Sequence, residues 1–577
     1  MFSTLSDSQR EIVFNKSGKF VVRACPGSGK TYCVGARLAR LIHVWEKKQE
    51  GIAVLSFTNV AWQEIEKKCN ENFCISKIPY PHFLGTIDSF VNKYIFLPFG
   101  HLILGCKGRP ILVGEPHGTW TGGKYDRDPN RYFDICSFDI DGNLIPTGSM
   151  QAFGFSWRNK DGSINGNVLN LEKAKKALLR TGYANQSDAN YFAMKILEKY
   201  PSIAKAIAVR FPYLIVDEAQ DTSDIQMKII EILIENGVNE VMLVGDPDQA
   251  IFEWNDARPE LLTKKYIEWK NSVVLNENRR SSQNICDFTF GISSLGNASI
   301  SVSERVKEFA HQPKIITYNG NLPQIVSDFI EECRKYGINV TKESTAIIYR
   351  SKNIINEVFG IPEIAFGTNV WIDKHTREFA KGKFLYDNGR FKEGFKIIER
   401  VLLKTLNSLS HCSENDISDA ITRMGFVNFK SQIYAFINLL PKTNISIGKW
   451  VAVANKVLKE NNCAFELHVH TEGLQYSFPQ LFLNEDKQIV EKEYRYGTVH
   501  SVKGETFDAT LLILKKKGLG AYYKAMLNKN VLISENEELR IAYVGMTRPR
   551  KILVIAVPDD ENKRAWENRL RTQLFLY

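Results

Sequence analysis

The sequence lacks the features that mark secreted, metal-stapled or membrane-embedded proteins. Its ten cysteines form no CxxC pair, and none is spaced with a histidine as zinc ligands are. Scattered thiols in a chain this long are typical of a reducing compartment. No apolar run reaches the roughly 20 residues that span a membrane, and the first segment, MFSTLSDSQREIVFNKSG, is too polar for a signal peptide. We therefore expect a soluble, cytoplasmic protein without a membrane partner.

The sequence also has no internal repeat, no low-complexity tract and no strong charge of one sign. Its 75 Lys and Arg residues outnumber its 65 Asp and Glu residues, and this small excess permits a polyanionic partner without establishing one. Hydrophobic residues make up 44% of the chain, enough for packed cores. The length of 577 residues indicates about three or four domains at roughly 150 residues each.

Short apolar runs bounded by polar turns recur along the chain, and helical patterns lie between several of them. Each run has the length and composition of all or part of a buried parallel strand. The runs are Phe20–Arg23, Ala53–Phe57, Leu214–Val216, Val241–Val244, Val273–Leu275, Ala346–Tyr349, Leu511–Leu514 and Ile552–Val557. Helical patterns follow the first two runs, over residues 31–45 and 60–73. This alternation predicts α/β domains with parallel sheets.

Two regions interrupt the alternation of strands and helices. Residues 97–163 are rich in glycine, aromatic residues and turn triplets, which predicts a loop or hairpin insertion; helices are expected after it, from Leu169 to Ala208. Residues 354–486 have a mostly helical pattern. We interpret both regions as insertions into two α/β cores.

The stretch ACPGSGKT, from Ala24 to Thr31, has the composition of a phosphate-binding loop. An apolar strand precedes it and a helical pattern follows it, so that a helix N-terminus would face phosphate. Gly27 and Gly29 would let backbone N–H groups approach phosphate oxygens. Lys30 would neutralise the β and γ phosphates, and Thr31 would hold Mg2+. The strict pattern begins with glycine, where this chain has Ala24; the alternative is a glycine turn without a ligand.

Two further apolar runs end in polar groups that suit nucleotide chemistry. In LIVDEAQD, Asp217 could bind the Mg2+ that Thr31 also holds, and Glu218 could orient and deprotonate a water molecule. Taken alone, such a carboxylate pair is common surface chemistry. In VMLVGDPDQAIFEW, the Gln249 amide could hydrogen-bond a γ phosphate, and Phe252 and Trp254 could stack on bases. The alternative for these two aromatic residues is a place in the core.

Other segments accompany these three in a fixed order. DSQR, which contains Gln9, precedes the loop; SFTNVAWQEI begins at Ser56 and GTIDSF at Gly85. Towards the C-terminus lie LNENRRSSQNI from Leu275, TVHSVKGETFD from Thr498 and LRIAYVGMTRPRK from Leu539. This ordered set closely resembles superfamily 1 helicases of the UvrD/Rep type and covers nearly all of both α/β cores.

The resemblance implies two RecA-like parallel-sheet domains with ATP between them. By that reading, domain 1A comprises residues 1–93 and 209–278, and domain 2A comprises residues 279–353 and 490–577. Insertion 1B, of mixed structure, takes residues 94–208, and insertion 2B, helical and shorter than is usual in the family, takes residues 354–489.

The resemblance also implies the site residues and the activity, which is ATP-driven movement 3′ to 5′ along single-stranded DNA, with unwinding of tailed duplex in many members. The implied catalytic residues are Lys30, Asp217, Glu218, Gln249, and two arginines, Arg280 and Arg548, that reach the γ phosphate when the cleft closes. The implied nucleotide-binding residues are Gln9, Ala24, Cys25, Pro26, Gly27, Ser28, Gly29, Lys30, Thr31 and Gly504, with Thr31 and Asp217 on Mg2+. The implied DNA-binding residues are Phe57, Thr58, Asn59, Thr86, Trp254 and His500.

The chain departs from the usual family motifs at several places. Val60 stands where a lysine is usual and Asp88 where a histidine is usual. Arg279 replaces an aromatic residue that stacks on adenine, and Thr506 replaces a nucleotide-contacting glutamate, with Glu505 one place earlier. These exchanges affect the expected DNA grip and nucleotide specificity, and they leave the implied catalytic residues intact.

A second resemblance concerns biological role. The KGETFD segment and the short 2B region resemble the small UvrD-like helicases of antiphage systems, such as the helicase subunit of Gabija, which works with an OLD-family nuclease. We expect no nuclease domain of the RecB type after Arg548, so cleavage would come from a partner. Three alternatives stay open: a helicase of general repair, a nucleotide-gated DNA-binding subunit that activates a nuclease with little unwinding, and an RNA-directed superfamily 1 helicase, although AYVGMTRPRK is more similar to the UvrD branch.

Overall fold

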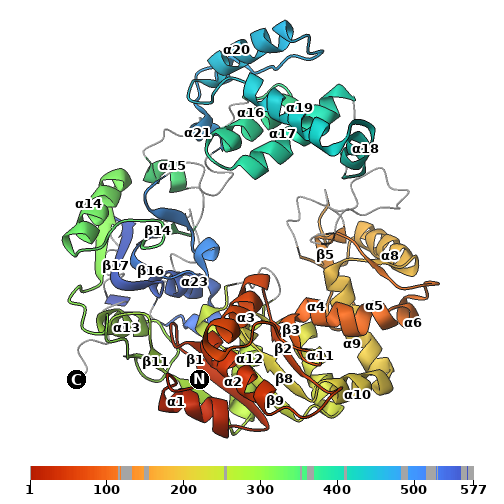
Figure 1. Ribbon diagram of the computed structural model, residues 1–577, viewed down its shortest axis with the longest axis vertical. Coiled ribbons are helices and arrows are strands. Elements are labelled where there is room, and N and C mark those ends of the chain that lie inside the picture. Colours follow the sequence, from red (N-terminus) through yellow and green to blue (C-terminus); the bar gives the residue numbers. More distant parts are fainter. Residues whose placement is uncertain are drawn as a thin grey trace. The chain divides into compact units, whose positions relative to one another are not determined.

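The chain folds into two compact α/β units (Figure 1). The first comprises Met1–Ala310, Lys524–Thr547 and Asn568–Tyr577, and the second comprises His311–Tyr523 and Arg548–Glu567. The computed structural model describes residues 2–114, 117, 133–147, 155–251, 257–350, 354–359, 370–407, 412, 414–482, 492–514, 528, 530–559 and 568–569. In these ranges no helix combines the length and the apolarity that crossing a membrane requires.

A six-stranded parallel sheet forms the centre of the first unit, in the order β10-β1-β9-β8-β2-β3. Its strands are β1 (Lys19–Ala24), β2 (Ile52–Ser56), β3 (Phe83–Thr86), β8 (Tyr213–Val216), β9 (Glu240–Gly245) and β10 (Val273–Leu275). The expected parallel sheet is therefore confirmed, and five of its strands coincide with the apolar runs of the sequence.

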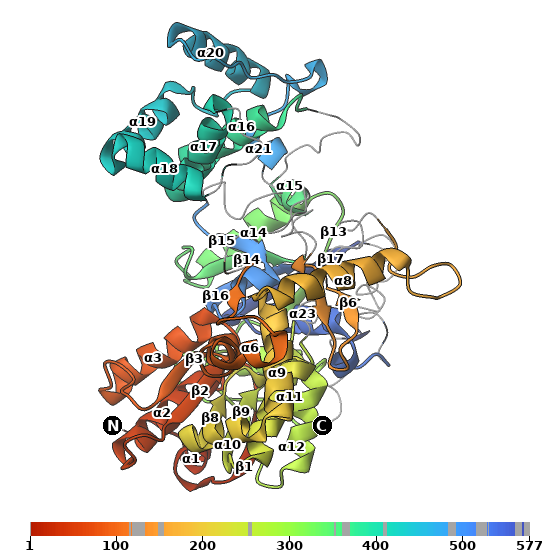
Figure 2. The ribbon, with the colours of Figure 1, turned by 90° about the vertical axis from the view of Figure 1, so that its right-hand side faces the viewer.

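Helices cover both faces of this sheet, which explains why its strands are apolar almost throughout. Phe20 and Val22 of β1 pack with α2 (Lys30–His43) and α3 (Asn59–Phe73). Val21, which points to the other face, packs in a core with α4 (Ile87–Val91), α9 (Gln186–Lys199) and α11 (Asp224–Glu235). Figure 2 shows α2 and α3 on one side of the strands and α9 and α11 on the other.

The part of the first unit between β3 and β8 combines helices with short strands, and its core is continuous with the second face of the sheet. The helices expected here are confirmed as α8 (Gly166–Arg180), α9 and α10 (Pro201–Arg210). A buried ion pair joins two of them, with Lys175 Nζ 2.9 Å from Asp188 Oδ1. Short strands accompany them as β4 (Ile111–Leu112), β5 (Cys136–Phe138), β6 (Leu144–Pro146) and β7 (Tyr183–Ala184).

The remaining elements of the first unit are short helices and strands around the sheet. They are α1 (Asp7–Arg10) with the π-helical turn Glu11–Asn15, α5 (Leu97–Phe99), α6 (His101–Leu104), α12 (Pro259–Glu268), β11 (Glu277–Asn278), α13 (Gln283–Phe290), β12 (Ile300–Ser301) and α23 (Glu537–Met546).

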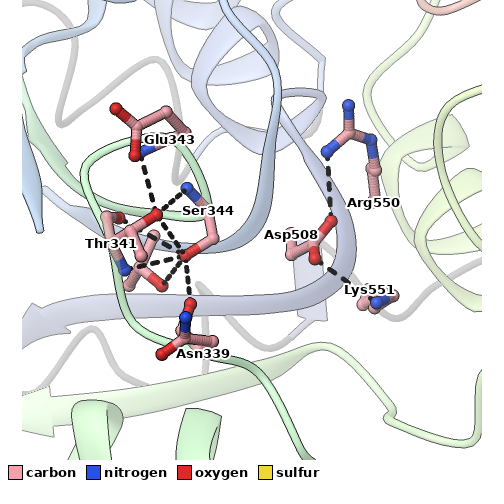
Figure 3. A network of polar contacts seen from close by, with 8 residues as sticks. Asn339, Thr341, Glu343, Ser344, Asp508, Arg550 and Lys551 are labelled. Carbon is pink, nitrogen blue, oxygen red and sulfur yellow. Dashed lines mark hydrogen bonds and ion pairs between the residues drawn. The ribbon is translucent and has the colours of Figure 1, made fainter.

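The second unit contains a five-stranded parallel sheet in the order β13-β17-β16-β14-β15. Its strands are β13 (Lys314–Tyr318), β14 (Thr345–Tyr349), β15 (Arg495–Thr498), β16 (Phe507–Ile513) and β17 (Pro549–Pro558). Asp508 of β16 accepts from Arg550 at 3.1 Å and from Lys551 at 3.3 Å, and the turn before β14 is closed by hydrogen bonds between Thr341 and Ser344 (Figure 3).

The region expected to be mostly helical is so over its described residues. Its helices are α15 (Ile355–Val358), α16 (Lys374–Asp387), α17 (Phe391–Leu406), α18 (Glu414–Met424), α19 (Phe426–Leu439), α20 (Ile447–Glu460) and α21 (Phe478–Phe482), and α14 (Leu322–Lys335) precedes them between β13 and β14. The division of the chain into domains 1A, 1B, 2A and 2B stays a prediction.

Candidate active site

The nucleotide-binding residues expected in the first unit gather at one edge of its sheet. The loop Cys25–Gly29 follows β1, Asp217 and Glu218 follow β8, and Gln249 lies in the 3₁₀ turn Pro247–Gln249 after β9. Since β1, β9 and β8 are adjacent and parallel, their carboxyl ends meet at this edge, where ligands of open α/β sheets bind.

The loop after β1 has a backbone that requires glycine. Gly27 and Gly29 have φ values of 74° and 77°, and Gly29 leads into the N-terminus of α2. A Cβ on Gly27 would lie 2.6 Å from Arg280 Cβ and 2.7 Å from Asn278 Oδ1, so no side chain fits there. Among the described residues, the buried Ser28 hydroxyl has no hydrogen-bond partner, which fits a loop that receives a ligand rich in oxygen.

Gln9 lies against this loop, where its side-chain nitrogen donates to the Ser28 carbonyl at 3.3 Å. The segment that carries it is fixed by Arg37 of α2, which is buried and donates to the carbonyl oxygens of Ile12 and Lys16 and to the Tyr213 hydroxyl. Sequence reasoning missed Arg37, because an arginine inside a helical pattern gives no sign that it points into the core.

Lys30 and Glu218 form an ion pair at the centre of the site, with Lys30 Nζ 2.7 Å from Glu218 Oε2. Burial alone would lower the pKa of Lys30, but the charges of Glu218 and Asp217 outweigh burial and raise it. Lys30 is therefore held as a cation next to two carboxylates, ready to exchange one anionic partner for another.

Thr31 and Asp217 bring two hard oxygen atoms together beside that pair. The Thr31 hydroxyl donates to Asp217 Oδ2 at 3.4 Å. Desolvation and the neighbouring Glu218 raise the pKa of Asp217, against the effect of Lys30. A buried carboxylate with a raised pKa beside a hydroxyl fits a site that a divalent cation would stabilise, because Mg2+ prefers such oxygen ligands and completes its shell with phosphate and water.

Glu218 has an unusual backbone conformation, and its side chain begins a relay of hydrogen bonds. Its φ of 54° is rare for a residue with a side chain, and strain of this kind concentrates at functional sites. Gln220 Nε2 donates to Glu218 Oε2 at 2.6 Å, and Gln220 Oε1 accepts from the Asp246 N–H at 3.1 Å. Asp246 Oδ2 in turn accepts from Gln249 Nε2 at 2.6 Å. The expected base and the expected γ-phosphate reporter are thus joined through Gln220 and Asp246.

Sequence reasoning missed Gln220 and Asp246, although both lie inside quoted motifs. Gln220 lies two residues after Glu218 in the chain, but the sequence gives no signal that its amide approaches Gly245 at the end of β9. A Cβ on Gly245 would lie 2.3 Å from Gln220 Oε1, so this glycine makes room for the relay.

Arg280 lies beside the phosphate loop, as its close approach to Gly27 requires. Its backbone N–H donates to Asn278 Oδ1 at 2.8 Å, and its Nη1 donates to the Thr547 carbonyl at 3.0 Å. These contacts place an arginine among the expected nucleotide residues within the first unit. Its role in catalysis stays a prediction.

The DNA-binding residues expected in the first unit follow the two strands at the far end of the same edge. Phe57 and Asn59 come after β2, and Thr86 ends β3, with Ser56 and Thr86 paired in register. Thr58 caps α3 by accepting from the Ala61 N–H at 3.2 Å. Val60, next to this group, is 72% exposed and offers no cation. Trp254 and Phe252 lie outside the described residues.

Both units end an edge strand with the same five-residue arrangement. In GTIDS (residues 85–89) and GTVHS (497–501), the threonine hydroxyl accepts from the serine N–H three residues later, at 3.1 and 3.3 Å. The serine hydroxyl donates back to the threonine carbonyl at 2.7 Å in each. The fourth place holds Asp88 in the first unit and His500, an expected DNA-binding residue, in the second.

The other predicted residues of the second unit are Gly504 and Arg548. Gly504 has a φ of 89°, which explains the glycine. Arg548 is buried and its Nη1 lies 3.5 Å from the Glu505 carbonyl oxygen. Their expected roles toward a nucleotide stay predictions.

The buried thiol in the phosphate loop leads to a testable difference between cysteines. Burial raises the pKa of Cys25 to about 12, so that at pH 8 only about one molecule in 10⁴ carries the reactive thiolate. Cys74, at the end of α3, is exposed. We expect iodoacetamide to label Cys74 in the native protein well before Cys25, as peptide mass spectrometry would measure. Both should react in denaturant; equal labelling of the native protein would contradict the buried position of Cys25.

Comparison with known proteins identifies a family that part of the chain matches. Residues 5–103 and 150–270 match the family described as the UvrD/REP helicase N-terminal domain. These ranges contain the phosphate loop, the segment Asp217–Asp221 and Gln249.

Several curated proteins are similar to the chain over longer stretches. A probable DNA helicase II homolog of Mycoplasma capricolum is 22% identical over 79% of the chain, and the match spans 59% of that protein's own length. The ATP-dependent DNA helicase PcrA of Leuconostoc citreum is 22% identical over 96% of the chain and 81% of its own. The ATP-dependent DNA helicase Rep of Buchnera aphidicola is 25% identical over 95% of the chain and 94% of its own.

Proposed function

Because the chain belongs to the UvrD/Rep-type superfamily 1 helicases, we propose that it is an ATP hydrolase that moves 3′ to 5′ along single-stranded DNA and unwinds tailed duplex. One observation carries the proposal: Lys30 and Thr31, after β1, lie within 2.7 and 3.4 Å of Glu218 and Asp217, after β8. This is the pairing of cation, hydroxyl and carboxylates that phosphoryl transfer requires.

Each residue of this pairing has a distinct task. Lys30 would leave Glu218 for the β and γ phosphates, because a triphosphate carries more charge than one carboxylate. Thr31 and Asp217 would hold Mg2+, which neutralises charge on the phosphate oxygens when bound. Glu218, released by Lys30 but still held by Gln220, would then accept a proton from the attacking water.

Two arginines complete the proposed mechanism. Arg280, beside Gly27, and Arg548, in the second unit, would stabilise the charge that develops on the γ phosphate. Hydrolysis removes the anion that attracts them, so their contacts would change with each turnover. Coupled to alternating grips on the strand, this change would move the protein along DNA.

The proposed DNA grip uses backbone phosphate contacts and stacking, which do not depend on sequence. Phe57, Thr58, Asn59 and Thr86 follow adjacent strands at the edge that also carries the nucleotide residues. His500 holds the fourth place of the matching segment in the second unit. Because both groups of residues lie at one edge of the sheet, a movement caused by nucleotide hydrolysis could be passed directly to the bound DNA.

The decisive experiment measures ATP turnover with and without single-stranded DNA, and then strand displacement on duplexes with 3′ or 5′ tails. We expect turnover to rise with DNA and unwinding to require the 3′ tail. Turnover that ignores DNA would count against the proposal, and a preference for the 5′ tail would contradict the polarity. Competition by an RNA strand would test for an RNA substrate.

A second candidate follows from the exposed Val60, which leaves the start of α3 without a cation for DNA phosphate. It is a nucleotide-gated DNA-binding subunit that activates a nuclease partner, of the OLD family in an antiphage system, and unwinds little by itself. Robust strand displacement by the isolated chain would exclude it, whereas stable co-purification with a nuclease would favour it over a role in general repair.

A further inference from the structure

Asp88 occupies an unusual position, in the first turn of α4 and two residues after Thr86. Its Oδ1 accepts two hydrogen bonds from side-chain amides, from Asn190 Nδ2 at 2.9 Å and from Gln226 Nε2 at 3.0 Å. Both amide residues are buried. The carboxylate is therefore fixed by neighbours that are distant in the sequence, and it cannot turn toward solvent without leaving two buried donors unsatisfied.

Gln226 connects Asp88 to the nucleotide side of the sheet. It is the third residue of α11, and its Oε1 accepts from the Ser223 N–H at 3.2 Å while its own N–H donates to Ser223 Oγ. Ser223 follows directly on the 3₁₀ turn Ala219–Asp221 and Thr222, that is, on the loop that carries Glu218 and Gln220. A shift of that loop would move Ser223, and with it the Gln226 side chain in the first turn of α11.

Asn190 connects Asp88 to the insertion instead. Its Oδ1 accepts from Gln186 Nε2 at 3.3 Å, and Gln186 Oε1 accepts from Asn92 Nδ2 at 2.9 Å. Asp88 is thus the point where α4, α9 and α11 meet through polar side chains, with one branch toward the nucleotide loop and another toward the insertion.

The charge of Asp88 is not explained by stability alone. In the described part of the chain no lysine or arginine pairs with it, and desolvation raises its pKa against the effects of the two amides and of His117. A neutral acceptor would make the same hydrogen bonds without the free-energy cost of removing a charge from water. The charge does strengthen both bonds, since a charged acceptor binds amide donors roughly twice as strongly as a neutral one.

We propose that Asp88 is a positioning residue that couples the nucleotide loop to the strand-gripping segment, through its hydrogen bond to Gln226. A change at Glu218 and Gln220 on hydrolysis would move the start of α11, and the Gln226–Asp88 bond would transmit that movement to α4 and to Thr86 at its N-cap. The inference rests on the proposed function, because it concerns how DNA stimulates turnover.

The experiment compares three variants, Asp88→Ala, Gln226→Ala and Asn190→Ala, in the full chain. For each we would measure turnover without DNA, turnover at saturating oligo(dT), the KM for ATP and oligo(dT) affinity. Asp88→Ala and Gln226→Ala should keep unstimulated turnover and KM within about twofold and lose about tenfold of the stimulation, which is the size of a typical coupling between sites. Asn190→Ala, which removes the branch to the insertion, should retain the stimulation.

A double variant, Asp88→Ala with Gln226→Ala, should be no worse than either single change, since both act on one bond. Asp88→Asn, which keeps the acceptor but loses the charge, should fall between wild type and Asp88→Ala, and thermal melting would show that it folds. Full stimulation in Asp88→Ala, or an equal loss in Asn190→Ala, would overturn the inference. A wild-type chain that DNA does not stimulate would instead overturn the proposed function, and the inference with it.

Discussion

Replacing Lys30 with alanine is expected to lower ATP turnover by at least about 10²–10³-fold, the effect of deleting one hydrogen-bond donor that stabilises a transition state. Lys30 is the cation at the centre of the site, 2.7 Å from Glu218 and held protonated by two carboxylates. Without it, Asp217 and Glu218 would repel the phosphates, and no cation would be released to them. Steady-state phosphate release, with and without single-stranded DNA, measures the loss.

A second lysine serves as a control for the loss of a positive charge. Lys47 forms an exposed ion pair with Glu50 away from the sheet edge, so Lys47→Ala should leave turnover unchanged. Thermal melting of both variants separates lost chemistry from lost fold. Turnover by Lys30→Ala that remains within threefold of wild type would mean that nucleotide is not bound by this loop.

Most strands of the two sheets were predictable because a buried strand requires a run of apolar residues, which is visible in the sequence. Strands covered on both faces must be apolar throughout, and all eight predicted runs coincide with strands of the two sheets, two of them running one residue past the strand end. Three strands of these two sheets were not predicted, β3 (FLGT), β13 (KIITY) and β15 (RYGT), and each lies at an edge of its sheet. An edge strand has one neighbour and less cover, so its sequence carries a weaker apolar signal.

The positions of single functional residues were predictable where the chemistry is local. Lys30, Thr31, Asp217 and Glu218 follow apolar strands, and the parallel sheet brings them together without further information. The relay through Gln220 was not predictable, because it depends on which way an amide points across two loops. Asp88 was visible in the sequence only as an exchange for histidine; its partner Gln226 lies 138 residues away.

Replacing Glu218 with glutamine is expected to stop hydrolysis while leaving nucleotide binding intact. Glutamine has the same shape and can still accept from Gln220, but it cannot take a proton from water at neutral pH. The loss should be about 10²–10⁴-fold in kcat, the usual contribution of a general base, with little change in the affinity for ATP. Single-turnover kinetics and binding of a fluorescent ATP analogue would separate the two effects.

The two variants should differ in ATP binding. Glu218→Gln should still bind ATP, whereas Lys30→Ala should bind it more weakly. Glu235→Gln, at the exposed end of α11, is the matched control and should behave as wild type. If Glu218→Gln hydrolyses ATP within tenfold of wild type, the base lies elsewhere and the strained backbone at Glu218 serves another purpose. If Glu218→Gln loses both hydrolysis and ATP binding, the Lys30–Glu218 ion pair is needed to keep the phosphate loop folded. The main role of the carboxylate is then structural.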